Sequence, residues 1–309
     1  MIKPRFLVAH RADQNNVGDI ASNPLQYFMK PEEYQVVDVA KLYDSNYADD
    51  VPVIVGGGGL IGNDFIGDFH RAFTQGADKI QLEQLWNNTW NLANQKYRDL
   101  HDEFQQRYHD LLQSYMDRLE FTKRPKFIWG AGHNGNDADI EWENIKWPKL
   151  LSEYDLVGTR DYHSKSRFQY VPCASCLHLA LRKKYPIKND VIIFEHKKQM
   201  IRDFGGDSIP RFVNSGSNIE HTIELLGSAN IILTNSYHGA YWGALLEKRV
   251  VLIGGMWSSK FKWLKYTPAV VGKKETWQDV IDEAKIYNGC LDEAAEINER
   301  FWKKVQERT

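Results

Sequence analysis

Short apolar runs alternate with segments of helical periodicity along most of the chain. The apolar runs predict strands at residues 6–9, 36–39, 52–55, 126–129, 155–158, 191–194, 231–233 and 250–253. Apolar positions at helical spacing predict helices at residues 19–29, 220–226, 240–246, 277–286 and 291–306. Strands that alternate with helices are typical of parallel sheets built from βαβ units. The pattern therefore predicts an α/β protein.

One long segment interrupts this alternation in the N-terminal half. Residues 78–120 carry apolar and aromatic side chains at helical spacing and contain no glycine or proline. This predicts a helical insertion, formed by one long helix or a helical hairpin. The alternation restarts after Pro172. We therefore expect two Rossmann-like domains facing a shared cleft, residues 1–172 with the insertion and residues 173–309 with closing C-terminal helices.

The composition agrees with this size and class. A chain of 309 residues is long enough for two domains, and 42% hydrophobic with 26% charged residues is typical of globular proteins. No run of eighteen apolar residues occurs, so no membrane span is expected. The N-terminus lacks the apolar region of a signal peptide, and three cysteines suit a reducing, cytoplasmic location. The net charge of −2 gives no overall attraction to nucleic acid or membrane.

Glycine-rich or polar loops follow the strands predicted at 6–9, 52–55 and 126–129. Gly56–Gly59 follows the strand at 52–55, and bare amides at such a turn can bind an anion, although a tight turn with close helix packing is the alternative. Asn16–Asp19 follows the first strand, with Asp19 expected as a helix N-cap. Because carboxyl ends of parallel strands meet at one edge, these loops supply candidate donor-binding residues. They are Gly57, Gly58, Gly59, Asn16, Gly18, Asp19, Gly132 and His133.

Two side chains after strands have the chemistry of a reaction centre. His238 follows the strand at 231–233, and the ordinary imidazole pKa suits proton transfer near neutrality. Its alternative role is to cap the next helix or to fill space beside Trp242. Arg160 follows the strand at 155–158, and its guanidinium suits phosphate or carboxylate, whereas a surface pair with Asp161 is the alternative. The neighbours Ser236, Tyr237 and Gly239 are further donor-binding candidates.

Three other segments suggest chemistry more weakly. Cys173 and Cys176 form a C-x-x-C motif that lacks the ligands for zinc, so buried packing cysteines are the favoured interpretation over a redox pair. Asp137-Ala138-Asp139 resembles a metal-binding triplet that is common by chance, and we predict no metal site. The segment 260–266 interleaves cations with aromatics, as nucleic-acid binders do, but an amphipathic surface stretch is the preferred explanation.

Taken in order, the loops resemble the motifs of the polysaccharide pyruvyl transferase family. The similar segments are Asn16–Asp19, Gly56–Leu60, Gly130–Gly132, Thr159–Asp161 with Ser164, and Thr234–Gly239. The resemblance implies a fold similar to glycosyltransferase-B enzymes and transfer of a pyruvyl group from phosphoenolpyruvate to sugar hydroxyls. It also implies that His238 is the acid or base and that Arg160 holds the anionic donor. We expect no cofactor besides the donor substrate, phosphoenolpyruvate or a nucleotide-sugar.

The chain departs from the family pattern at two places. The family's arginine two residues before the histidine is Ser236 here, so a cation of the donor pocket must come from elsewhere. Arg11, Lys260 and Lys262 are candidates, and we include Lys260 among the donor-binding residues. The Cys173–Cys176 segment stands where the family usually has an Asp-Pro turn.

Two other functions suit the same architecture. A glycosyltransferase would use a nucleotide-sugar, with Glu220, Tyr241 and Trp242 as candidates for holding the nucleoside. Its acceptor would be a glycan, a small molecule or a hydroxylated nucleobase in DNA. A sugar- or anion-binding module without turnover is the third option. A glycan is the expected partner ahead of a nucleic acid.

Overall fold

We analysed a computed structural model of the chain. It describes residues 3–10, 15–38, 51–60, 125–133, 141–144, 154–197, 208–254, 258–273 and 275–309. The predicted helical insertion at 78–120, Arg11 and the Asp137–Asp139 triplet lie outside the described residues.

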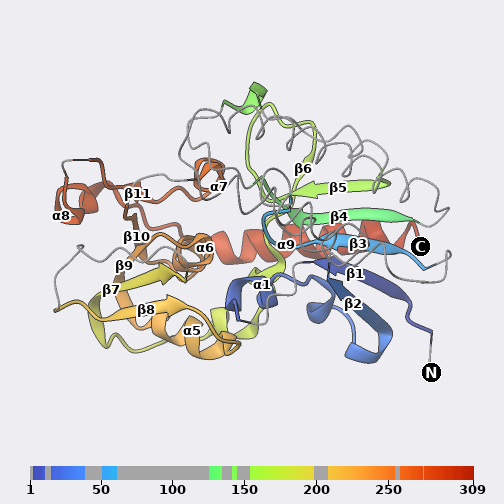
Figure 1. The fold of residues 1–309 in the computed structure, drawn as a ribbon, viewed down its shortest axis with the longest axis horizontal. Coiled ribbons are helices and arrows are strands. Elements are labelled where there is room, and N and C mark those ends of the chain that lie inside the picture. Colours follow the sequence, from blue (N-terminus) through green and yellow to red (C-terminus); the bar gives the residue numbers. More distant parts are fainter. Residues whose placement is uncertain are drawn as a thin grey trace, which may run out of the picture.

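The described strands form two parallel sheets, which confirms the predicted α/β class (Figure 1). The first sheet has the order β2-β1-β3-β4-β5-β6. Its strands are β1 (Phe6–His10), β2 (Tyr34–Asp38), β3 (Val53–Gly56), β4 (Lys126–Ala131), β5 (Leu156–Thr159) and β6 (Gln169–Tyr170). The second sheet has the order β11-β10-β9-β7-β8. Its strands are β7 (Asn189–His196), β8 (Arg211–Asn214), β9 (Ala229–Thr234), β10 (Arg249–Leu252) and β11 (Ala269–Val270).

Helices and short 3-10 turns connect these strands. The described α-helices are α1 (Val17–Ala21), α5 (Ile219–Gly227), α6 (Tyr237–Leu245), α7 (Ser259–Lys262), α8 (Trp277–Val280) and α9 (Cys290–Gln306). The 3-10 turns are η1 (Leu25–Tyr27), η2 (Pro31–Glu33), η5 (Trp142–Asn144), η7 (Ala174–Leu177), η8 (Leu179–Arg182) and η9 (Ile281–Glu283). Among the described helices, none is both long and apolar enough to cross a bilayer.

The predicted helix at 19–29 is wrong in its bounds and its cap. The helix α1 ends at Ala21, because Ser22 folds its hydroxyl back onto the Asp19 carbonyl and Pro24 follows within two residues. The N-cap is Asn16, whose side chain accepts the amides of Gly18 and Asp19, and Asp19 lies in the first turn. The strands β6, β8 and β11 were not predicted, because none of them contains more than two consecutive apolar residues.

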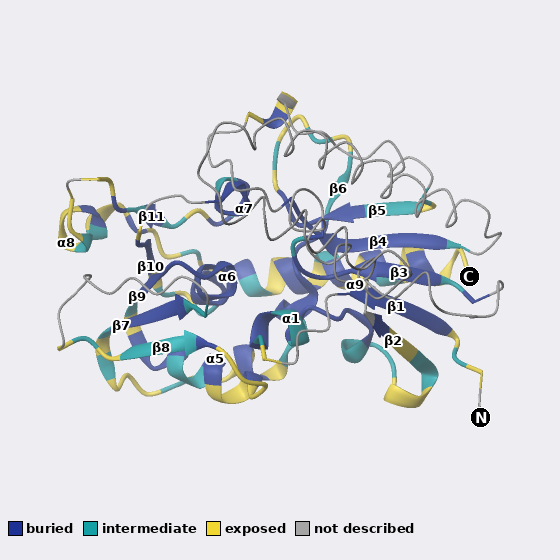
Figure 2. Cartoon of the chain, in the orientation of Figure 1, coloured by how far each residue is buried: buried dark blue, intermediate teal, exposed yellow. Residues whose placement is uncertain are grey.

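The helix α6 is buried on every residue, which explains its small side chains (Figure 2). A Cβ added to Gly239 would lie 2.3 Å from the Thr234 hydroxyl, and one added to Gly243 would lie 2.7 Å from Val250. Glycine at these positions therefore lets the helix pack directly on β9 and β10. This close packing fixes the start of α6, where His238 lies, against the carboxyl end of β9.

The helix α9 packs against the cores of both sheets (Figure 1). Its first turn contributes Cys290 and Ala294 to the core around α6. Its last turns contribute Phe301 and Val305 to the core of the first sheet. Between them, the fully buried Asn298 accepts a hydrogen bond from the Trp129 indole at 2.7 Å. The same helix therefore ties the two sheets together.

Candidate functional site

The candidate residues cluster because parallel strands end at shared edges. Gly57 follows β3, Gly132 follows β4, and Arg160 follows β5 in the first sheet. Ser236 and His238 follow β9 in the second sheet. The contacts described below join these loops across the two sheets.

His238 is the point where the two sheets' loops meet. Its ring is 5% exposed and lies 4.9 Å from the Trp242 ring, centroid to centroid, and 5.3 Å from the Tyr237 ring. On its other side is Gly18 of α1, where an added Cβ would lie 2.0 Å from His238 Nδ1. The Asn16–Asp19 loop therefore contacts the loop that carries His238. Both loops are among the segments that resemble the family's motifs.

The His238 imidazole is neutral at physiological pH. Burial lowers the pKa of His238 well below its ordinary value, and the positive charges of Arg160 and Lys260 lower it further. The ordinary pKa expected from the sequence is therefore wrong for this residue. A neutral imidazole can accept a proton on one nitrogen while it donates a hydrogen bond from the other.

Arg160 is a buried cation, so the alternative of a surface pair with Asp161 is wrong. The residue is 4% exposed, and its guanidinium carbon lies 3.8 Å above the centre of the Tyr237 ring. Its Nε has no hydrogen-bond partner among the residues that the structure describes. Gly132 makes room for it, since a Cβ there would lie 2.5 Å from Nε. A buried guanidinium with an unused donor is suited to an anionic ligand.

Asp161 was not among the candidate site residues, although it belongs to the Thr159–Asp161 motif, and it lies next to Arg160 in the candidate site. It is 1% exposed and accepts the backbone amide of His133 at 2.6 Å. Burial raises the pKa of Asp161 to about 7, against the opposing effects of Arg160 and of the His133 amide. An acidic residue directly after a strand-end arginine was the signal that could have identified it. His133 also contacts the Ser259 hydroxyl through Nδ1 at 2.7 Å.

The tetraglycine turn, Gly56–Gly59, packs against Ser22 after α1 and against the end of β4. Gly57 has φ +80°, and a Cβ on it would lie 2.2 Å from the Ser22 carbonyl oxygen. Its amide donates to the Trp129 carbonyl at 3.1 Å, so this amide is committed to the fold rather than to a ligand. Gly58 has φ +84° and accepts the Gly132 amide at 3.1 Å. The turn is thus held by close packing, as the alternative to anion binding expected, and the partly exposed Gly59 lies at its outer end.

A second polar group missed by the sequence analysis joins α1 to the histidine loop. Asn214, at the end of β8, donates from Nδ2 to Asn16 Oδ1 and to the Ser236 hydroxyl, each at 3.2 Å. The Asn214 Oδ1 is buried without a hydrogen-bond partner. An asparagine that ends a four-residue strand gave only a weak sequence signal.

Of the suggested cations Arg11, Lys260 and Lys262, the two lysines lie among the described residues, whereas Arg11 lies outside them. Lys260 is 7% exposed on α7 and lowers the pKa of His238. Lys262, two residues later, forms an ion pair with Glu141 at 3.0 Å. Of these two lysines, Lys260 is the one recorded as acting on His238.

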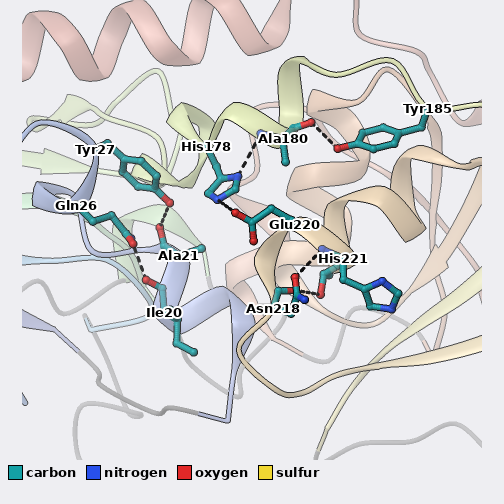
Figure 3. Close-up of polar contacts among 11 residues, drawn as sticks. Ile20, Ala21, Gln26, Tyr27, His178, Ala180, Tyr185, Asn218, Glu220 and His221 are labelled. Atoms are coloured by element: carbon teal, nitrogen blue, oxygen red, sulfur yellow. Dashed lines mark hydrogen bonds and ion pairs between the residues drawn. The ribbon is translucent and has the colours of Figure 1, made fainter.

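Several residues suggested for nucleoside or nucleic-acid binding lie elsewhere. Tyr241 and Trp242 are buried and hydrogen bonded to Cys173 and Ser175, so neither presents a ring for stacking a base. Glu220 forms an ion pair with His178 at 3.4 Å (Figure 3). In the segment 260–266 the large apolar side chains Phe261, Trp263, Leu264 and Tyr266 are buried, so the segment does not present a base-stacking surface. Lys262 and Lys265 are partly exposed, as in an amphipathic surface stretch, whereas Lys260 is buried.

The three cysteines are buried and free, as the packing interpretation expected. Burial raises the pKa of both Cys173 and Cys176, so neither is a thiolate at neutral pH. Among the residues that the structure describes, no group of three or more histidine, cysteine or acidic side chains is arranged to hold a metal ion.

Comparisons with known proteins add little to this geometry. No family model matches the chain, and no curated protein matches it. Among solved structures, it is similar to an uncharacterized protein from Klebsiella pneumoniae subsp. pneumoniae NTUH-K2044. The two are 17% identical over 81% of this chain and 83% of the other, with a TM-score of 0.35. A likeness at this level carries no argument about function.

Proposed function

We propose that the protein is a transferase of the polysaccharide pyruvyl transferase superfamily that moves a pyruvyl group from phosphoenolpyruvate to sugar hydroxyls. One observation carries this proposal: two buried cations, Arg160 and Lys260, act on a neutral, buried His238. Phosphoenolpyruvate carries both a phosphate and a carboxylate, so two cations near one proton-transfer group match its charge.

The arrangement of the donor follows from these charges. Arg160 would bind one anionic group through its unused Nε, and Lys260 would neutralise the other. The tetraglycine turn would approach the phosphate with the amides of Gly58 and Gly59, for which the structure records no partner within the described residues. The glycosyltransferase-B arrangement, with domains at residues 1–172 and 173–309 and a cleft between them, and a cytoplasmic location are parts of this proposal.

The proposed reaction consumes one phosphoenolpyruvate molecule and two hydroxyl groups of the sugar acceptor. One hydroxyl oxygen bonds to C2 of the donor and the bond between C2 and the phosphate oxygen breaks. A second hydroxyl oxygen completes the ketal at C2. Of the two hydroxyl protons, one ends on the methylene carbon, which becomes a methyl group, and the other ends on the phosphate. His238 is the group that would carry such a proton.

For the nucleotide-sugar alternative, the residues suggested to hold the nucleoside are buried or held in an ion pair. Its proposed nucleoside surface consisted of Tyr241 and Trp242, which are buried in the core, and Glu220, which is paired with His178. A glycan acceptor is likewise favoured over a nucleobase, because the aromatic side chains that would stack on a base are buried.

The direct test is phosphate release from phosphoenolpyruvate in the presence of a panel of oligosaccharides. We expect phosphate release that depends on the acceptor, with a matching gain in acceptor mass. Lys260→Gln should raise the KM for phosphoenolpyruvate about tenfold or more, because a charge-assisted contact is worth about 1.5–3 kcal/mol. Lys262→Gln is the matched control, since Lys262 belongs to the same short helix but pairs with Glu141.

The result that would overturn the proposal is equally direct. If phosphoenolpyruvate neither releases phosphate nor raises the melting temperature, while a nucleotide-sugar raises it, the donor assignment is wrong. Equal effects of the two lysine substitutions would remove Lys260 from the donor site.

A further inference from the structure

The two nitrogens of His238 have different surroundings. Nδ1 lies against Gly18 of α1, on the side where the glycine loops meet. Nε2 faces the connection between the sheets, where it contacts the Cys173 sulfur at 3.6 Å.

Cys173 is the middle of a buried chain of hydrogen bonds. The Trp242 indole Nε1 donates to the Ser175 hydroxyl at 3.0 Å. The Ser175 hydroxyl in turn contacts the Cys173 sulfur at 3.2 Å. All four side chains, from Trp242 to His238, are buried, so water does not replace these contacts at low cost.

The direction of this chain is fixed at its Trp242 end. An indole nitrogen is a donor only, so the Ser175 oxygen must accept from it. The single Ser175 hydroxyl proton then has the Cys173 sulfur as its recorded acceptor. The single thiol proton is left for His238 Nε2. If Nε2 instead donated to the sulfur, the sulfur would accept from both Ser175 and His238, and the thiol proton would be left without a recorded acceptor among the described residues.

We propose that Cys173 is a positioning residue that donates its thiol proton to His238 Nε2 and so holds the imidazole as the tautomer protonated on Nδ1. The nitrogen that faces Gly18 and the glycine loops is then a hydrogen-bond donor. His238 is thereby directed to donate a hydrogen bond on that side rather than to accept one.

The electrostatics of the pair agree with this assignment. Burial raises the pKa of Cys173 and lowers that of His238, so a thiol faces a neutral imidazole instead of a thiolate facing an imidazolium. Arg160 acts on both groups, Lys260 acts on the histidine, and Asp19 acts on the cysteine. The pair is therefore not arranged as a nucleophilic cysteine with its base.

The tautomer can be measured without any assumption about the reaction. Long-range proton–nitrogen correlation spectra of protein labelled with ¹⁵N-histidine distinguish a protonated ring nitrogen from an unprotonated one. The His238 signals are assigned as those missing from His238→Gln. In the unmodified protein at neutral pH we expect protonated Nδ1 and unprotonated Nε2.

Substitutions test whether Cys173 causes this state. Cys173→Ala removes the donor, so we expect His238 to shift toward the Nε2-protonated tautomer that predominates in free histidine. Cys173→Ser keeps a donor and should keep the Nδ1-protonated form. Cys176→Ala is the matched control, because this buried cysteine of the same motif contacts Asn298 and should leave His238 unchanged.

Three outcomes would overturn the inference: Nε2 protonated in the unmodified protein, no change in Cys173→Ala, or an equal change in Cys176→Ala. The spectra of the remaining histidines report whether each variant is folded, and Cys173→Ser supplies the conservative variant if Cys173→Ala is not.

The catalytic consequence rests on the proposed function and has a separate readout. Cys173→Ala should lower kcat roughly ten- to hundredfold with little change in the KM for phosphoenolpyruvate, because the donor's anionic groups meet other residues. Cys173→Ser should restore most of the rate. If the unmodified protein shows no transfer, the proposed function fails, while the tautomer measurement still decides the role of Cys173.

Discussion

The contact between Gly18 and His238 gives a quantitative test of how the two sheets meet. Replacing Gly18 with alanine would place a methyl group 2.0 Å from His238 Nδ1 and 2.6 Å from two ring carbons. The ring has little room to retreat, since Trp242 and Tyr237 pack against it. We expect Gly18→Ala to destabilise the fold by about 2–3 kcal/mol, at the upper end of the usual cost of overpacking.

A double-mutant cycle separates this clash from other effects of the substitution. In a His238→Ala background the ring is absent, so the same Gly18→Ala change should become neutral or stabilising by up to about 1 kcal/mol, the intrinsic helix preference of alanine over glycine. The two changes should therefore couple by about 3 kcal/mol, measured by urea unfolding of the four proteins. Gly289→Ala is the control for backbone strain alone, because Gly289 has φ +72° and open space around it.

The reasoning would be refuted by additive substitutions. If Gly18→Ala costs the same with and without the His238 ring, the methyl group does not meet the imidazole. The helix α1 would then not contact the histidine loop, and the convergence of loops on which the site depends would be lost.

Three further predictions follow from buried polar groups. The pKa of Asp161 rises from 3.8 to about 7 on folding, so the folded state binds the proton more tightly and loses stability as pH rises through this range. Asp161→Asn does not titrate and should therefore become more stable than the unmodified protein between pH 4 and 7, by up to about 4 kcal/mol. A difference in the free energy of unfolding that does not change with pH, measured by urea unfolding, would contradict this. Arg160→Gln should weaken phosphoenolpyruvate binding at least tenfold, measured by calorimetry. It should also raise the pKa of His238, measured by NMR titration, and an unchanged pKa would argue against an electrostatic interaction between Arg160 and His238. Asn298→Leu should lower the free energy of unfolding by about 2–4 kcal/mol, because the Trp129 indole loses its acceptor and the Pro172 carbonyl loses a donor. An unchanged free energy of unfolding would mean that these two groups find other hydrogen-bond partners.

The sequence predicted the sheet class and most strands because their apolar runs are long enough to be read locally. It also placed Gly132, Arg160 and His238 after strands, and parallel pairing brings such positions to one edge of a sheet. What it could not give was the approach of one sheet's loops to the other's. The contact of Gly18 with His238 joins positions 220 residues apart in the chain and depends on the packing of both sheets.

Burial accounts for the remaining differences. The pKa of His238, the raised pKa of Asp161 and the buried position of Arg160 all depend on the loss of water around these groups. No local pattern distinguishes a buried arginine from an exposed one at a strand end. The same limit explains why Tyr241 and Trp242 looked available for stacking, although α6 is enclosed on all sides.

The position of α9 has a consequence for how the nascent chain matures. The strands of the first sheet are complete by Tyr170, but that sheet's core includes Phe301 and Val305. A ribosome must add about 130 more residues before these side chains emerge, a delay on the order of ten seconds. Until then Trp129 packs against Phe28 but lacks its contacts with Phe301 and Trp302, so the core of the first sheet stays incomplete until α9 is made.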